Sequence, residues 1–112
     1  LAILGGGAGT VKIYFNEDGV LATTPGWESD RVDNGNSFDF GDIDGDGWQD
    51  LAVAYNWQQD QGSGHFAVYY SDGGVLPPNP DWESAVYGYG SAANLADVDN
   101  IGPDAQLMAT VE

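Results

Sequence analysis

Four carboxylates crowd into the nine-residue segment 42–50, "DIDGDGWQD", at Asp42, Asp44, Asp46 and Asp50. Calcium is a hard cation that takes about 6–8 oxygen ligands, and acidic side chains alternating along a tight loop can surround one ion. We therefore predict a calcium site formed by these four carboxylates and the backbone carbonyl of Trp48. Gly45 and Gly47 permit the positive φ angles that such a loop requires. The ion would offset the repulsion between the carboxylates.

The residues on either side of this loop indicate strands rather than helices. "SFDFGDI" precedes it and "DLAVAY" follows it, and in this chain apolar residues come in short runs with a period near two, set off by turn residues. An EF-hand would need flanking helices and a carboxylate at loop position 12, which is Val53 here. The segment therefore resembles an EF-hand loop placed inside a β-hairpin.

The chain contains an internal repeat with an offset of 55 residues. "YFNEDGVLATTPGWES" (14–29) matches "YYSDGGVLPPNPDWES" (69–84), and the same offset places Asp42 and Asp44 on Asp97 and Asp99. Within the repeat, "HFAVYY" predicts a third strand and "DWESAVYG" a weaker fourth. Four short strands per repeat are typical of a β-propeller blade, and a ring needs about 4–8 blades. We predict an all-β chain of four-stranded antiparallel blades.

The repeats divide the 112 residues unevenly. Residues 1–36 would supply strands 2–4 of a first blade, 37–91 a complete middle blade, and 92–112 strands 1 and 2 of a further blade. Two repeats cannot close a ring alone. The chain is then a fragment of a longer propeller, or a unit whose copies form a homo-oligomeric ring as a trimer or tetramer. The duplicated second strand fits ring closure poorly, which favours the fragment.

The second acidic loop, residues 97–105, is degenerate. Asp97 and Asp99 are retained, but Ile101 and Ala105 stand at loop positions 5 and 9, and Asp104 is one residue out of register. We expect this second metal site, with Asp97, Asp99 and Asp104 as its candidate ligands, to be weak or empty.

The segment "FGDIDGDGWQDLAVA", recurring at blade spacing, resembles the FG-GAP/VCBS repeat family, which includes the propeller domains of integrin α subunits. This resemblance covers essentially the whole chain. It implies a β-propeller with calcium in the hairpin between strands 1 and 2, an extracellular or cell-surface location, and a role in adhesion, in ligand recognition or as a module beside an enzyme.

The charge balance restricts the classes of partner. The chain carries 18 acidic residues against two basic ones, a formal net charge of −16. Clustered Lys and Arg are needed to bind phosphates, so nucleic acid is disfavoured as a partner. No apolar run is long enough to predict membrane insertion. Cysteine is absent, and the single histidine, His65, has no nucleophile at a suggestive spacing. We expect no enzymatic activity.

Tryptophans leave alternative functions open. Trp27 and Trp82 are equivalent in the repeat, which favours packing between blades. Trp57 lies among amides in "NWQQDQGSG", and together with Trp48 it suits stacking on a sugar ring. The leading prediction is a non-catalytic, calcium-binding recognition or adhesion module with a protein or glycan ligand. The alternatives are a lectin-like propeller or accessory domain of a polysaccharide-active enzyme, and a purely structural self-assembling unit.

Overall fold

Antiparallel β-strands make up the regular structure of the chain. The computed structural model describes residues 2–4, 9–30, 34–57, 65–85, 90–96 and 106–111. Its strands are β1 (Ala2–Leu4), β2 (Val11–Ile13), β3 (Asn16–Glu17), β4 (Val20–Leu21), β5 (Trp27–Glu28), β6 (Asn34–Gly41), β7 (Asp50–Trp57), β8 (His65–Tyr69), β9 (Trp82–Glu83), β10 (Gly90–Ala96) and β11 (Gln106–Val111). Within these ranges there is no helix, and hence none that is long and apolar enough to cross a membrane.

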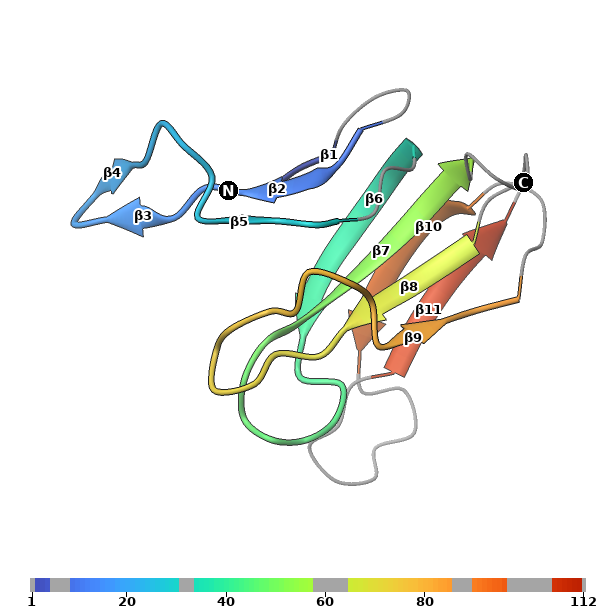
Figure 1. Ribbon diagram of the computed structural model, residues 1–112. Helices are drawn as coiled ribbons and strands as arrows, with labels where there is room; N and C mark the ends of the chain where they lie inside the picture. The colour runs from blue at the N-terminus through green and yellow to red at the C-terminus, as the bar shows by residue number, and fades with distance from the viewer. Residues whose placement is uncertain are drawn as a thin grey trace.

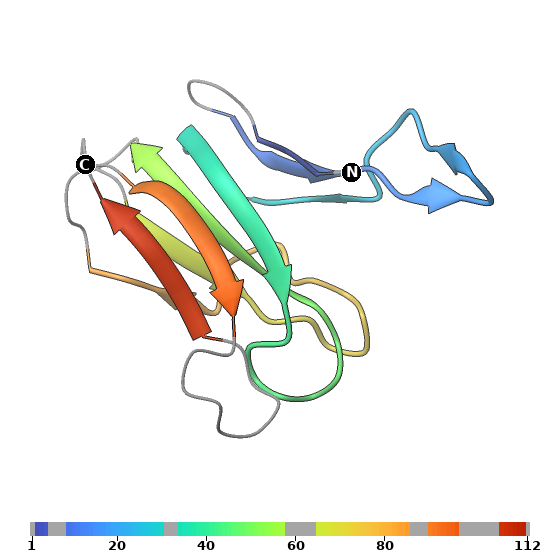
Figure 2. The ribbon, with the colours of Figure 1, turned by 180° about the vertical axis from the view of Figure 1, so that it is seen from behind.

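The central sheet contains four strands in the order β6-β7-β8-β9, each antiparallel to its neighbours. Among the described residues three further sheets accompany it (Figure 1): β1-β2-β5, drawn in blue to cyan, the small β3-β4 pair, and β10-β11, drawn in orange and red. Figure 2 shows from behind that β10-β11 lies alongside the long strands of the central sheet, and β10 contacts both β6 and β7. The all-β antiparallel class is therefore confirmed, while the propeller remains a prediction.

The observed strands begin slightly before the boundaries expected from the sequence. β6 starts at Asn34 rather than at residue 37, and β10 starts at Gly90 rather than at residue 92. The β6–β7 register shifts between Asn34 and Gly35 and again between Gly35 and Ser37, as it does at a β-bulge. The first residues of β6 still pair with β7. β5 and β9, at residues 27–28 and 82–83, are related by the 55-residue offset.

The hydrophobic core lies between the first sheet and the central sheet. β7 is buried on both faces, with residues 51–55 fully inaccessible to solvent. Leu51, Val53 and Tyr55 of β7 join Val11 and Ile13 of β2 in one cluster. Burial on both faces explains why this strand is a continuous apolar run instead of an alternating one.

Two tight turns recur one repeat apart, and the sequence analysis did not identify them. Asp18 and Gly19 connect β3 to β4 with φ angles of 53° and 89°, and Gly73 and Gly74 have φ angles of 60° and 88° in the equivalent turn. Positive φ at both central residues is typical of the two-residue hairpin turn that Asp-Gly and Gly-Gly favour. The signal was therefore present in the sequence at both positions.

Candidate metal centre

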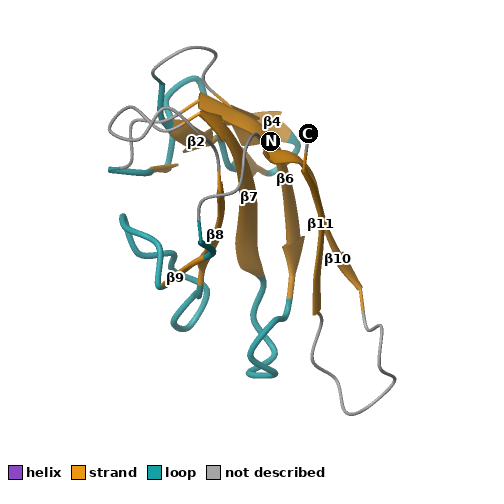
Figure 3. Cartoon of the chain, turned by 90° about the vertical axis from the view of Figure 1, so that its right-hand side faces the viewer, coloured by secondary structure: helices purple, strands orange, loops and turns teal. Residues whose placement is uncertain are grey.

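The acidic loop connects β6 to β7 at one end of the central sheet. Gly41 and Asp50 are register partners, so the ladder brings the two ends of the loop together. Figure 3 shows this loop extending beyond the strands, at the same end as the connection between β8 and β9. The loop is thus the predicted strand–loop–strand hairpin, with β7 in the hydrophobic core and Phe38 of β6 packed against it.

Asp42 organises the backbone of the loop. Its Oδ1 accepts hydrogen bonds from the backbone N–H groups of Gly45 (2.8 Å) and Asp46 (3.1 Å), and its Oδ2 accepts one from Gly47 (2.9 Å). Gly45 and Gly47 have φ angles of 80° and 91°, as the sequence predicts. L-residues with a side chain rarely adopt this conformation. The glycines therefore let the chain curl around the Asp42 carboxylate.

Asp50 anchors the loop to the sheet. It is fully buried, and its Oδ2 accepts a hydrogen bond from the Ile43 N–H (2.8 Å) while its Oδ1 accepts one from the Ser71 N–H (2.9 Å). A buried carboxylate is costly unless it is paired or hydrogen-bonded. These two bonds connect the β6–β7 loop to the end of β8. Sequence analysis missed Ser71 because its role depends on the fold and no motif marks it.

Three of the carboxylates converge. Oxygen atoms of Asp42, Asp44 and Asp50 all lie within 4.8 Å of one another, and this triad could hold a metal ion. Calcium–oxygen distances are about 2.3–2.6 Å, so two oxygens bound to one calcium ion lie at most about 5 Å apart. The spacing and the all-oxygen donor set therefore fit calcium.

The loop has no basic partner among the described residues. Lys12 pairs with Glu28 across β2 and β5 at 3.2 Å, and Arg31 lies outside the described residues. Desolvation, and to a lesser extent the charges of Asp50 and Asp46, raise the pKa of the Asp44 carboxyl, against the opposing effect of the Asp46 N–H bond. Desolvation likewise raises the pKa of the Tyr70 hydroxyl, with added contributions from the nearby aspartates. The uncompensated negative charge is what a bound cation would neutralise.

The other two predicted ligands have different surroundings. The Asp46 carboxylate is not part of the converging triad, and its Oδ1 accepts a hydrogen bond from the Trp48 N–H (2.8 Å). The Trp48 side chain is 51% exposed. A Cβ atom placed on Gly74 would lie 3.1 Å from the Trp48 ring, so the indole packs directly over that glycine. One face of the loop is thereby fixed against the β8–β9 connection.

The repeat-related tryptophans differ in their surroundings. Trp27 packs edge-on against Tyr69, with ring centroids 5.4 Å apart, and its Nε1 donates a hydrogen bond to the Leu76 carbonyl (3.1 Å). This contact confirms packing between consecutive repeats for Trp27. Trp82 is 43% exposed. Trp57 proves to be the last residue of β7 and not part of a loop, and its side chain lies outside the described residues.

The second predicted metal loop, with Asp97, Asp99 and Asp104, lies outside the described residues. Its flanking strands are described, and they correct the alignment of the repeat. Ala96 pairs with Gln106 in the way that Gly41 pairs with Asp50. Gln106, and not Ala105, is therefore the register equivalent of Asp50. The connection is one residue longer than residues 42–49, which a constant offset of 55 could not reveal.

Comparison with known proteins gives one match. Residues 1–53 match the model of the FG-GAP-like repeat, a range that runs from β1 into β7 and includes the whole acidic loop. No curated protein and no solved structure shows significant similarity to the chain. The match agrees with the internal repeat and with the aspartate loop between two strands. Residues 1–53 are therefore similar to an FG-GAP-like repeat.

Proposed function

We propose that the chain is a non-catalytic, calcium-binding β-propeller module that serves recognition or adhesion outside the cell. The observation that carries this proposal is the convergence of Asp42, Asp44 and Asp50 in the hairpin of an FG-GAP-like repeat. The bound ion would be structural, because it would join the loop to the sheet through Asp50 and fix one rim of the module.

The three carboxylates of the triad differ in how firmly the protein itself orients them. Asp42 and Asp50 are already oriented by backbone N–H groups, so part of the site is preformed before any ion arrives. Asp44 is exposed and accepts a hydrogen bond from the Asp46 N–H at 3.1 Å. We expect calcium to order Asp44 most, and to bind with a Kd on the order of 10⁻⁴–10⁻³ M, as in other extracellular modules.

Calorimetric titration of chelator-treated protein with calcium tests this proposal. One site per chain is expected, because the triad is complete in the first loop while the second lacks two of the predicted carboxylates. Two sites would show that the 97–105 loop also binds calcium. Absence of any binding at millimolar calcium would contradict the proposal.

A glycan is the ligand class that one observation favours over others. The Trp48 indole is fixed against Gly74 yet remains half exposed beside the acidic loop, as a platform for stacking on a sugar ring requires. A glycan array read with and without calcium, with Trp48→Ala as the comparison, tests this version. We expect any hit to be lost in the variant. Hits that Trp48→Ala leaves unchanged would assign the recognition to another surface.

A further inference from the structure

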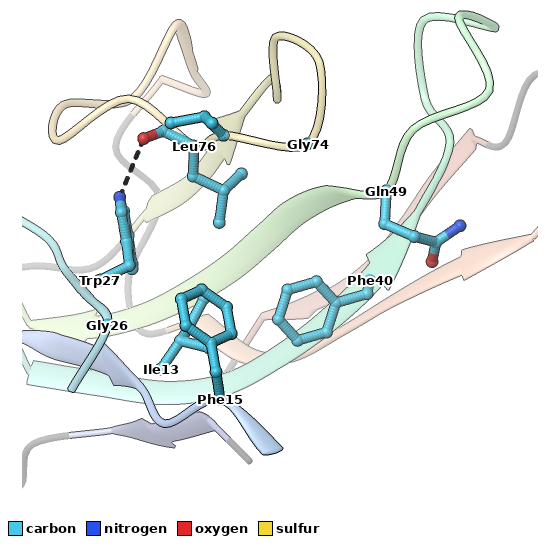
Figure 4. A pocket seen from close by; sticks show the side chains of 9 residues that line it. Ile13, Phe15, Gly26, Trp27, Phe40, Gln49, Gly74 and Leu76 are labelled. Carbon is cyan, nitrogen blue, oxygen red and sulfur yellow. Dashed lines mark hydrogen bonds between the residues drawn. The ribbon is translucent and has the colours of Figure 1, made fainter. Parts of the chain in front are cut away.

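An apolar cavity of about 490 Å³ lies at the junction of the first two repeats. It is lined by Ile13, Phe15 and Trp27 of the first repeat and by Phe40, Val75 and Leu76 of the second. In Figure 4 the Phe15 and Phe40 rings lie side by side opposite Leu76, and Trp27, which donates a hydrogen bond to the Leu76 carbonyl, lies at one end of the hollow. The volume falls within the range of about 300–1,000 Å³ typical of small-molecule sites.

The lining residues of each repeat are held in place by local contacts. The Phe15 ring lies so close over Gly26 that a Cβ atom there would be 2.1 Å from it, and the Gly26 N–H donates to the Ile13 carbonyl (2.9 Å). On the opposite wall, Gly74 is covered by Trp48. The hollow is therefore a preformed feature, since backbone hydrogen bonds and packed rings determine the position of both sides.

Large apolar side chains remain exposed at this cavity. Phe15 is 50% exposed, Phe40 36% and Val75 70%. An enclosed ligand would cover these surfaces and remove them from water. A flat aromatic ligand could pack its edge or face against the rings of Phe15, Trp27 and Phe40. Such ring–ring contacts stabilise binding beyond the hydrophobic gain from buried area.

The polar groups of the lining limit the class of ligand. Among the lining side chains only Trp27 and Gln49 carry polar atoms, and the Trp27 Nε1 already donates to Leu76. A sugar would bury several hydroxyl groups here, and the Gln49 amide is the one lining side chain free to hydrogen-bond them. The hydroxyl groups left without a partner would make binding unfavourable. Gln49 belongs to the acidic loop, and the chain carries a net charge of −16, so an anion would be repelled.

We infer that this cavity binds a small, uncharged aromatic molecule with a single polar group that reaches the Gln49 amide. This binding site includes none of the proposed metal ligands, although Gln49 lies in the same loop, and it goes beyond the function proposed above. It would be distinct from glycan recognition at Trp48, because the two surfaces require opposite ligand chemistry.

Four probes with controlled differences test the inference by ligand-detected NMR and fluorescence titration of the whole chain. These are 2-naphthol, naphthalene, 2-naphthoate and glucose. We expect saturable binding of 2-naphthol with a Kd on the order of 10⁻⁴ M. Naphthalene should bind about five-fold more weakly, and 2-naphthoate and glucose should not bind measurably. Equal binding of 2-naphthoate, or no saturable binding of 2-naphthol, would overturn the inference.

The repeat provides a matched pair of variants for the cavity. Val20 and Val75 are equivalent in the repeat and both are 70% exposed, but only Val75 lines the cavity. Val75→Ser should weaken 2-naphthol binding about five-fold, and Val20→Ser should leave it unchanged. Equal losses in the two variants would show non-specific adsorption and overturn the inference. Gln49→Met should abolish the preference for 2-naphthol over naphthalene, and a retained preference would contradict the assigned role of Gln49.

Discussion

Consecutive repeats of this chain keep the same ladder while their side-chain environments differ. The hairpins β6–β7 and β10–β11 pair in the same register at their loop ends, yet Asp50 begins β7 and Gln106 begins β11. An antiparallel hairpin at this place therefore does not require the acidic residue. The carboxylates of the 42–50 loop are therefore not needed to pair the strands, and three of them converge in a triad that could hold a metal ion.

A similar difference separates Trp27 from Trp82. Both stand in the sequence "WES", but Trp27 contacts Tyr69 and Leu76 of the following repeat, while Trp82 is 43% exposed. Burial of this residue is therefore a property of the neighbouring repeat, and the local sequence does not determine it.

The largest expected effect is at Asp50, the position where the two hairpins diverge most. Asp50→Asn leaves one oxygen to serve the N–H groups of Ile43 and Ser71, so one buried donor loses its acceptor. We expect a loss of about 3 kcal/mol in the free energy of unfolding, in chelator as well as in calcium. Urea unfolding measures it, with Asp18→Asn in an exposed turn as the charge-matched control. A loss below about 1 kcal/mol would contradict the anchoring role.

The tryptophan pair should give the next largest difference. Trp27→Ala removes a half-buried ring and the hydrogen bond to Leu76, and should cost about 2 kcal/mol. Trp82→Ala should cost less than about 1 kcal/mol, because much of its surface is exposed. Equal costs in urea unfolding would show that Trp82 is as well packed as Trp27, contrary to the comparison.

Two equivalent glycines allow a finer test of the same kind. Gly19 and Gly74 have φ angles of 89° and 88°, so replacement by Ala strains both by about 1 kcal/mol. Only at Gly74 would the new Cβ also contact Trp48, at 3.1 Å. We expect Gly74→Ala alone to shift the tryptophan emission spectrum. Identical spectra for the two variants would contradict the packing of Trp48 over Gly74.

Much of this molecule was predictable because its signals are local or periodic. The short apolar runs between turn residues predicted β6 and β7, and the glycines at 45 and 47 predicted the positive φ angles of the loop. The equivalence of Gln106 and Asp50 was missed because the second loop has one extra residue, and an alignment with a constant offset of 55 residues does not detect such an insertion. Ser71 and the apolar cavity were missed because each depends on how segments distant in sequence pack together.

The central claim is that calcium binds between Asp42, Asp44 and Asp50. Thermal melts of the wild-type chain, Asp44→Asn and Asp18→Asn, each in chelator and in 10 mM calcium, test it most directly. We predict that calcium raises the Tm of the wild type and of Asp18→Asn by about 5 °C. Asp44→Asn should melt close to the wild type in chelator and gain almost nothing from calcium. An equal calcium-induced rise in all three proteins would contradict the claim.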